Sequence, residues 1–354
     1  MTMCTSGAIS ATDLAKEGGA MKFSIFSVCD HYLDVPRSIG QLYSQILSEM
    51  ELAEELGYWA YFIAEHHFHE YGAVPSPPTF LGAASQRTSR LGLGVAVSVL
   101  PFHNPLVLAE EYAVVDQLSQ GRLRLGVGSG YLQHEFQAFG ISPEERRQRF
   151  DEALAIMVRA WQGEPFSFEG TYYRVDNVRI AVTPYQKPHP PLWVAILHAD
   201  RAYYVGRMGR NIMMVPYATC DTIDDLAEII AAYRRGYAEA GGEGEPDIAV
   251  ALHTYVSSSK EAAREEADAA LWRYVVTRLY ARRRSFDELD RGEVILFGDP
   301  ELVAARLSKL ADMGVTHVMA LMNFGALEAE RVRQSMITFA REVIPRVVAT
   351  PSSL

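Results

Sequence analysis

The sequence predicts an α/β protein folded as a (β/α)8 TIM barrel with insertions, and three observations support this fold class. Beyond Met21, short apolar runs alternate with amphipathic stretches, an alternation typical of parallel βα units. Eight such runs are present, which is the number of strands in a closed barrel. Several runs, such as VAVSVL and WVAIL, are apolar without interruption, which indicates strands buried on both faces.

The competing architecture is an open, doubly wound sheet, which shows the same alternation. Such a sheet carries a glycine-rich fingerprint at its first strand–helix turn. The corresponding stretch here, SVCDHYLDVPRS, contains no glycine, so the barrel is favoured. A minimal barrel needs about 250 residues. The chain has 354 residues and therefore leaves room for insertions.

The first half of the chain is expected to form four βα units. The expected strands span residues 23–28, 59–64, 93–100 and 123–127. The expected helices span residues 39–56, 77–87, 105–118 and 144–161. The first helix ends on Gly57, which suits a left-handed cap, and the third opens with Pro105, which is favoured at a first helical position.

The second half begins with an interruption and then resumes the alternation. Residues 166–191 are rich in aromatic residues and proline and predict a hairpin insertion. Residues 281–300 are charged and weakly periodic, so we expect a second insertion there, a long loop ahead of the last βα unit. The remaining strands are expected at residues 192–197, 211–215, 248–255 and 316–322, and the remaining helices at residues 202–208, 223–240, 260–280 and 328–345.

The N-terminus differs in character from the rest of the chain. Residues 1–20 are small, polar and rich in glycine, and they predict a flexible extension ahead of a single barrel domain over residues 21–354. They have neither the basic region nor the apolar run of a signal peptide, and no stretch approaches about 18 continuous apolar residues. We therefore expect neither secretion nor membrane insertion.

Charge and cysteine content narrow the partners and the compartment. The chain has 33 Lys and Arg against 44 Asp and Glu, a net charge of −11, and it lacks the basic balance that nucleic-acid binding needs. Its three cysteines, Cys4, Cys29 and Cys220, form no CxxC pair, so neither a disulfide framework nor a cysteine zinc site is supported. We expect a cytoplasmic protein with reduced thiols and no nucleic-acid partner.

The densest cluster of chemically active residues is the run EHHFHE at residues 65–70, directly after the second strand. Active-site groups of barrels lie at the carboxyl ends of strands, and this run holds three histidines and two carboxylates within six positions. Imidazole can act as a general acid or base near neutral pH, and a carboxylate can orient it. A structural histidine pair is the alternative. A metal site is disfavoured, because adjacent histidines on extended backbone point opposite ways and HExxH is absent.

Two further motifs could bind a cofactor. The run GVGSG at residues 126–130 follows the fourth strand, and its glycines permit close approach to a phosphate or a ring system, although a simple tight turn explains them equally well. Arg146, Arg147 and Arg149 lie near a helix start and could hold a phosphate, or could form a solvated helix face.

Taken together, five segments carry a family resemblance: EHHFHEYG, AVSVLPFHNP, VVDQLSQGRLRLGVGSGYLQHEFQAFG, RFDEALAIM and FGDPELVAARLSKLADMGVTHVMALMNFG. In this order they resemble the bacterial luciferase-like family of flavin-dependent monooxygenases, and the resemblance is closest to the luciferase alpha-chain branch. It implies a TIM barrel that binds reduced FMN, reacts it with O2 to a flavin hydroperoxide and oxygenates a small organic substrate. Because no dinucleotide fingerprint is visible, reduced flavin is expected from a separate reductase.

The resemblance also implies roles for individual residues. His66 matches the family's catalytic histidine, with His67 and Glu65 beside it. A non-prolyl cis peptide against the flavin ring would fall at Ala96–Val97. The other cofactor-binding candidates are Gly128, Ser129, Arg149, His198 and Arg201.

The phosphate end of the flavin departs from the family pattern. Arg149 is the expected phosphate ligand. Ser129 stands where the luciferase alpha chain has an arginine, and LHADR at residues 197–201 replaces a Ser/Thr-rich turn. Arg201 or His198 could supply the missing donors, whereas Asp200 would repel a phosphate unless it is paired.

Near the predicted strand ends lie residues that would form an apolar substrate chamber: Phe102, His103, Tyr131, Phe136 and Phe139. Core packing is the alternative for the aromatic ones. The chamber must keep water from the reactive flavin, and the loop at residues 281–300 is expected to cover it.

Three alternative functions stay open. They are an oxidoreductase that uses the deazaflavin F420, a non-catalytic flavin-binding subunit of a heterodimer, and a metal-dependent barrel hydrolase. The family resemblance further implies a homodimer built from helices near the second and third βα units. No metal is expected.

Overall fold

The computed structural model describes residues 21–242, 244–279 and 282–348. The predicted N-terminal extension at residues 1–20 lies outside these ranges. None of the helices in the described ranges is long and apolar enough to span a lipid bilayer.

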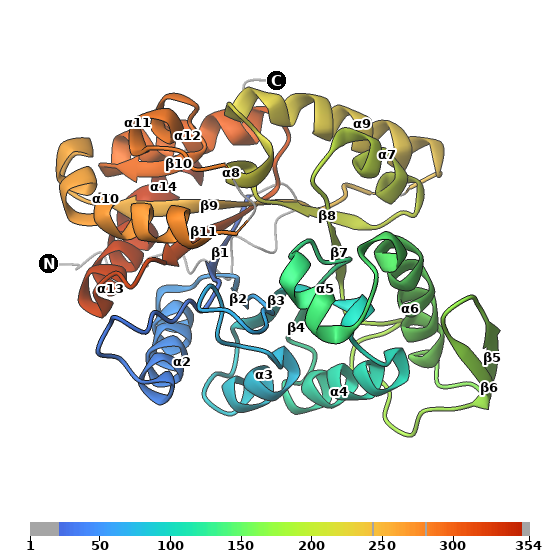
Figure 1. Cartoon of the computed structure of the whole chain (residues 1–354). Helices are drawn as coiled ribbons and strands as arrows, with labels where there is room; N and C mark the ends of the chain where they lie inside the picture. The colour runs from blue at the N-terminus through green and yellow to red at the C-terminus, as the bar shows by residue number, and fades with distance from the viewer. Residues whose placement is uncertain (1–20, 243, 280–281, 349–354) are drawn as a thin grey trace, which may run out of the picture.

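Eight parallel strands close into a barrel, as predicted (Figure 1). Each strand pairs with the next along the chain, β8 pairs with β9, and β11 returns to β1, which completes the ring. The barrel strands are β1 (Lys22–Ser27), β2 (Ala60–Ile63), β3 (Gly92–Val99), β4 (Leu123–Gly128), β7 (Leu192–Ala195), β8 (Asn211–Met214), β9 (Ile248–Val256) and β11 (His317–Asn323).

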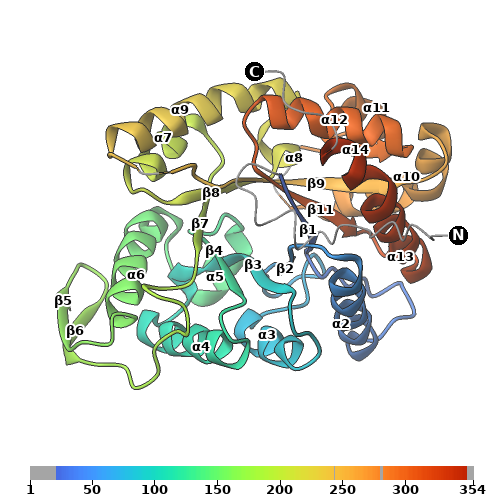
Figure 2. The ribbon, with the colours of Figure 1, turned by 180° about the vertical axis from the view of Figure 1, so that it is seen from behind.

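Helices surround the barrel on the outside (Figures 1 and 2). The longer ones are α2 (Ile39–Leu56), α3 (Pro77–Ser85), α4 (Pro105–Leu118), α6 (Arg146–Ala160), α7 (Ala199–Arg207), α9 (Leu226–Glu239), α10 (Lys260–Thr277), α12 (Pro300–Asp312) and α13 (Ala329–Thr338). The shorter ones are η1 (Leu100–Phe102), α5 (Gln133–Phe139), η2 (Pro143–Glu145), α8 (Pro216–Thr219), η3 (Ile223–Asp225), α11 (Phe286–Arg291), η4 (Phe339–Val343) and α14 (Ile344–Val348).

The first helix shows why local sequence specifies these elements. Ser38 and Gln41 form a reciprocal capping box at the start of α2. The helix ends at Gly57, whose φ of 81° is left-handed, as the sequence predicted. Likewise, Asn104 caps α4 ahead of Pro105.

The predicted long loop at residues 281–300 is wrong for the residues that the structure describes. Residues 286–291 form α11, and β10 (Ile295–Gly298) adds a ninth parallel strand beside the carboxyl half of β9. The charges of this segment suggested an exposed loop, but they are paired within the fold: Asp287 binds Arg264, and Asp290 binds Arg306. The intervening apolar residues are buried. This segment is therefore part of the packed fold, as is α12, which was not predicted.

The hairpin insertion is confirmed. Strands β5 (Phe166–Glu169) and β6 (Arg174–Val178) pair antiparallel and project outside the barrel beyond α6 (Figure 2). Glu152 on α6 accepts hydrogen bonds from the backbone N–H groups of Thr171, Tyr172 and Tyr173, which ties the hairpin turn to the helix.

A polar cluster and aromatic rings fill the amino end of the barrel. Buried Asp247 accepts hydrogen bonds from Lys22, Trp193 and Thr316. Burial by itself would raise the pKa of Asp247, but His317, whose Nδ1 lies 3.6 Å from the carboxylate, and Lys22 lower it below its usual range. Trp59 packs edge-on against the ring of Trp193. Side chains thus fill the amino end of the barrel, and the cavity described below lies at its carboxyl end.

Candidate active site

A cavity of about 320 Å³ lies at the carboxyl ends of the barrel strands. Its wall includes residues from β1, β2, β3, β4, β7, β8, β9 and β11 or from the segments that directly follow them. Most of the lining is apolar. Seven predicted site residues line it: Glu65, His66, Ala96, Val97, Gly128, Ser129 and Tyr131.

Glu65 is a buried carboxylate with four hydrogen-bond donors around it. One oxygen accepts from Nε2 of His67 at 3.1 Å and of His103 at 2.8 Å. The other accepts from the Ser98 hydroxyl at 3.0 Å and the Val99 N–H at 3.1 Å. Burial by itself would raise the pKa of Glu65, but the hydrogen bonds from His103 and His67 outweigh it and lower the pKa to about 2. Glu65 is therefore an anion that orients both imidazoles and the end of β3.

His66 stands at the cavity wall with a second buried carboxylate behind it. Its Nδ1 lies 3.3 Å from Glu135 Oε1, which also accepts the His67 backbone N–H at 2.9 Å. Gly72 passes against the imidazole so closely that a Cβ there would lie 2.6 Å from the Cβ of His66. In the described chain, Nε2 of His66 has no hydrogen-bond partner. This nitrogen is left to meet a ligand.

His67 does not line the cavity. It lines an outer groove of about 590 Å³, which His66 borders as well, and its ring packs edge-on against Phe139. The ligand atoms of Glu65, His67 and His103 lie within 4.8 Å of one another, a geometry that could gather a metal ion. Both histidine Nε2 atoms, however, already meet a single oxygen of Glu65 at hydrogen-bond distance. A cation would have to displace both N–H groups, so the donor set fits a charged hydrogen-bond network better.

The wall opposite His66 is backbone from β3 and β4. The Ala96–Val97 peptide is cis, as the family resemblance implied, and both residues line the cavity. A Cβ on Gly128 would lie 2.5 Å from Cγ2 of Val97, so only glycine lets these strands approach as they do. Ser129 follows, with its side chain among the lining residues.

The three basic candidates for a phosphate lie outside the cavity lining. Arg149 pairs with Glu145 at 2.8 Å and stacks on Tyr172 at 4.3 Å, on the side of the hairpin. His198 is the N-cap residue of α7, and Arg201 in its first turn reaches Asp151 at 3.3 Å. These two follow Leu197, which does line the cavity. His198 and Arg201 are therefore closer along the chain to a residue that lines the cavity than Arg149 is, although sequence reasoning favoured Arg149.

The predicted aromatic chamber coincides with this cavity only at Tyr131. Phe102 packs on Phe136 at 4.9 Å and on Phe139 at 4.7 Å, behind His67, and none of the three lines the cavity. His103 is held by Glu65, which outweighs burial and raises the pKa of its imidazole. Of the chamber residues, Tyr131 alone lies in the described cavity wall.

Four of the polar lining residues were not among the predicted site residues: Tyr71, Glu135, Tyr274 and Arg278. Tyr71 and Glu135 follow strands two and four, so the rule that active sites form at strand ends could have found them. Tyr274 and Arg278 come from the end of α10, where no local pattern marks them.

Comparison with known proteins agrees with this geometry. The family model described as luciferase-like monooxygenase matches residues 21–317. The crystal structure of monooxygenase RslO1 from Streptomyces bottropensis superimposes with a TM-score of 0.86 and 32% identity, over 92% of this chain and 99% of that one.

Two curated relatives represent different cofactors. The oxygenase component of flavin-dependent trigonelline monooxygenase from Acinetobacter baylyi is 26% identical over 250 residues, 70% of this chain and 68% of that protein. The F420-dependent glucose-6-phosphate dehydrogenase of Amycolatopsis mediterranei is 25% identical over 319 residues, 84% of this chain and 92% of that protein. The family match across most of the barrel settles the classification: this chain belongs to the luciferase-like monooxygenase family.

Proposed function

We propose that this protein is the oxygenase component of a two-component monooxygenase, which receives reduced FMN from a separate reductase and uses O2 to oxygenate a small organic molecule. The observation that carries the proposal is His66, which lines the apolar cavity, has buried Glu135 at its Nδ1 and has no partner for its Nε2 among the described residues. The similarity to a flavin-dependent oxygenase component supports it. So does the lack of a glycine fingerprint for a nicotinamide cofactor in the sequence.

The residues present fit a flavin. The planar ring would lie in the cavity against Ala96 and Val97, with Gly128 and Ser129 beside it. The phosphate would meet the first turn of α7, where backbone N–H groups and the helix dipole favour an anion and where Arg201 carries a positive charge. When bound, reduced FMN would supply the two electrons with which one atom of O2 enters the substrate and the other leaves as water.

The protein's own contribution is to hold and move a proton beside the substrate. If Nδ1–H of His66 donates to the Glu135 carboxylate, the lone pair of Nε2 is the acceptor that faces the cavity. His66 can then take a proton from a reacting group and return it, while Glu135 stabilises the imidazolium that forms. Glu65 is a positioning residue: it fixes His67 and the end of β3 and takes no part in the proton transfer itself.

The cavity wall also excludes water. Phe26, Val97, Met213, Met214 and Met319 contribute apolar surface, and Leu279 lies at the wall as well. A dry, low-dielectric site prevents solvent from releasing H2O2 unproductively. This role, expected of a loop at residues 281–300, would fall to the side chains that line the cavity.

The decisive experiment combines flavin binding with turnover. Wild-type protein should bind reduced FMN under anaerobic conditions and, with an added flavin reductase, should oxygenate a member of a small-molecule screen. His66→Ala should keep its FMN affinity and lose about 100- to 10,000-fold in turnover. Rapid NADH or NADPH oxidation by the purified protein with FMN alone would overturn the two-component proposal. Unchanged turnover in the variant would favour a non-catalytic role for His66.

An F420-dependent oxidoreductase is the second candidate, because an F420-dependent dehydrogenase matches most of this chain. Parallel titrations with FMN and F420 separate the two. Tighter binding of F420 would replace the oxygenase proposal by hydride transfer.

We further propose that the protein is cytoplasmic and forms a homodimer. Light scattering of the purified protein would test the dimer.

A further inference from the structure

One cation faces the cavity. Arg278 directly follows α10, and among the described residues that line the cavity it is the single Lys or Arg. Its guanidinium lies over four tyrosine rings, with centroid distances of 5.0 Å to Tyr71, 5.9 Å to Tyr131, 5.3 Å to Tyr217 and 5.7 Å to Tyr274. Such contacts stabilise a partly desolvated cation but do not neutralise it.

Arg278 has no carboxylate partner in the described ranges. Arg273, in the last part of α10, shows the usual arrangement: it stacks on Tyr32 at 5.4 Å and pairs with Asp34 at 2.8 Å. The two carboxylates that line the cavity are occupied elsewhere, because Glu65 and Glu135 accept bonds from histidines and backbone N–H groups. A half-buried guanidinium without a counter-charge is costly, so a negative partner is expected from outside the described residues.

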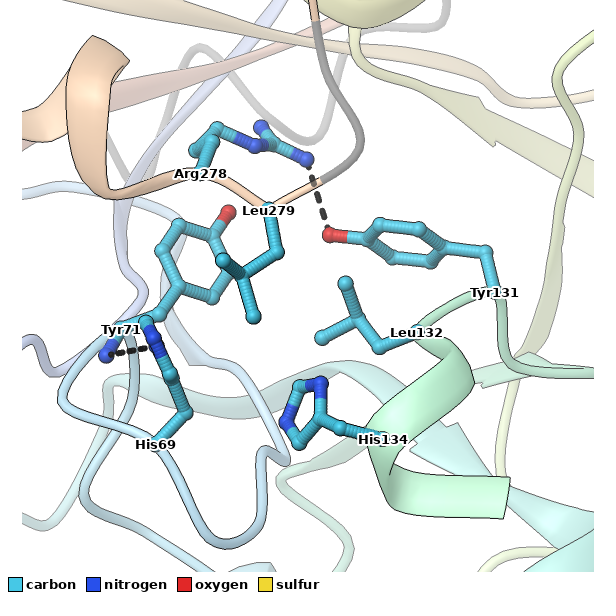
Figure 3. Close-up of a pocket in the computed structure, with 7 residues that line it drawn as sticks. All are labelled: His69, Tyr71, Tyr131, Leu132, His134, Arg278 and Leu279. Atoms are coloured by element: carbon cyan, nitrogen blue, oxygen red, sulfur yellow. Dashed lines mark hydrogen bonds between the residues drawn. The ribbon is translucent and has the colours of Figure 1, made fainter. Parts of the chain in front are cut away.

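The hydroxyl groups around Arg278 also lack an acceptor. Arg278 donates to the hydroxyl oxygen of Tyr131 at 2.8 Å (Figure 3). It also donates to the hydroxyl oxygen of Tyr274 at 3.1 Å, and the hydroxyls of Tyr71 and Tyr274 lie 2.9 Å apart. Tyr131 therefore keeps its own proton, and the Tyr71–Tyr274 pair keeps one of two. The cluster offers a positive charge and two O–H protons for which the described residues show no hydrogen-bond acceptor, and the Tyr217 hydroxyl beneath the same guanidinium is also buried without a partner.

The position of this cluster is close to the proposed proton-transfer residue. The ring of Tyr71 packs on the imidazole of His66 with centroids 4.6 Å apart. The proposed phosphate donors at the start of α7 lie outside the cavity lining, beyond Leu197, so Arg278 is left for the molecule to be oxygenated.

We propose that Arg278, with the hydroxyls of Tyr131 and the Tyr71–Tyr274 pair, binds the anionic group, a carboxylate or phenolate, of an otherwise apolar substrate. The proposal rests on the proposed function only in assigning this anion to the substrate. The apolar lining selects the body of the molecule, which would lie beside the flavin ring. The guanidinium fixes which end faces His66.

The test uses a matched pair of probes, 2-naphthoate and its neutral analogue 2-naphthamide, titrated into FMN-loaded and flavin-free protein by calorimetry. Wild type should bind the naphthoate at least about tenfold more tightly than the amide, since hydrogen bonds to a charged group are worth more than neutral ones. Arg278→Gln should weaken naphthoate binding by about 10- to 100-fold and leave naphthamide binding nearly unchanged. Arg278→Lys should restore part of the loss, because it keeps the charge without the fork of donors.

Arg273→Gln is the matched control, because it removes a stacked arginine of the same helix that already has its carboxylate. It should bind naphthoate as wild type does. Equal affinity of wild type for the two probes, no saturable naphthoate binding at millimolar concentration, or unchanged naphthoate binding in both Arg278 variants would overturn the proposal. Loss of FMN rather than naphthoate binding would assign Arg278 to the cofactor instead. Because binding needs no turnover, an anion site without oxygenase activity would refute the proposed function alone.

Discussion

Replacing Glu65 by glutamine measures how much the charge of this buried carboxylate contributes to the free energy of unfolding. The side chain keeps its shape, and the amide oxygen can still accept from Ser98 and Val99 while the NH2 group donates to His67 and His103 in their other tautomers. What is lost is the charge. A pKa lowered from 4.5 to about 2 corresponds to about 3 kcal/mol of stability at about 1.4 kcal/mol per pH unit.

The pH dependence gives this prediction its sign. Because the pKa of Glu65 is lower in the folded than in the unfolded protein, its contribution is complete above about pH 4.5 and disappears as the pH falls towards 2. Urea unfolding, followed by circular dichroism, should therefore show Glu65→Gln less stable than wild type by about 2–3 kcal/mol at pH 7. The difference should shrink steadily between pH 4.5 and 2.

A surface variant provides the control. Glu51→Gln removes an exposed carboxylate that pairs with Arg87 at 2.6 Å, and it should change stability by less than about 1 kcal/mol. Equal stability of Glu65→Gln and wild type at pH 7 would refute the account of Glu65 as a stabilising anion. So would a deficit that stays constant down to pH 3.

Three further predictions concern the proposed cofactor site and the metal alternative. Gly128→Ala places a methyl group 2.5 Å from Cγ2 of Val97 and should cost about 1–3 kcal/mol in unfolding free energy and weaken FMN binding, whereas Gly82→Ala, where no atom lies within 4 Å, should be neutral or slightly stabilising. Arg201→Gln should weaken FMN binding about tenfold or more in fluorescence titrations and leave riboflavin, which lacks the phosphate, unaffected; an equal loss for riboflavin would speak against the phosphate assignment. Dialysis against EDTA should leave turnover unchanged, and a loss restored by a divalent cation would instead make Glu65, His67 and His103 metal ligands.

Sequence reasoning succeeded where short-range pattern suffices. Strands and helices of the barrel follow from periodicity and caps, and all eight barrel strands lie within or close to their predicted ranges. His66 was found because parallel strands deliver their carboxyl ends to one face, so a histidine just after a strand must lie near the cavity. The cis peptide at Ala96–Val97 came from family resemblance, since no local rule predicts it.

Sequence reasoning failed where a residue's surroundings come from distant segments. The charges of residues 281–300 suggested a loop, but ion pairs to α10 and α12 allow that segment to pack as a helix and a strand. Phe102 lies next to a strand end as expected, yet it faces Phe139 and not the cavity. Which side of a short turn faces inward depends on neighbours that periodicity does not describe.

By itself, the sequence determined the barrel, the position of the histidine run at its carboxyl end and the membership of a family, because each is encoded in local pattern or in the order of motifs. Only the tertiary structure decided which charged side chains have an ion-pair partner among the described residues. Tyr71 and Tyr274 are separated by 203 positions in the chain, yet their hydroxyls meet 2.9 Å apart beneath Arg278. Whether an arginine is paired or free depends on every element packed around it, and that is a property of the closed barrel rather than of any stretch of residues.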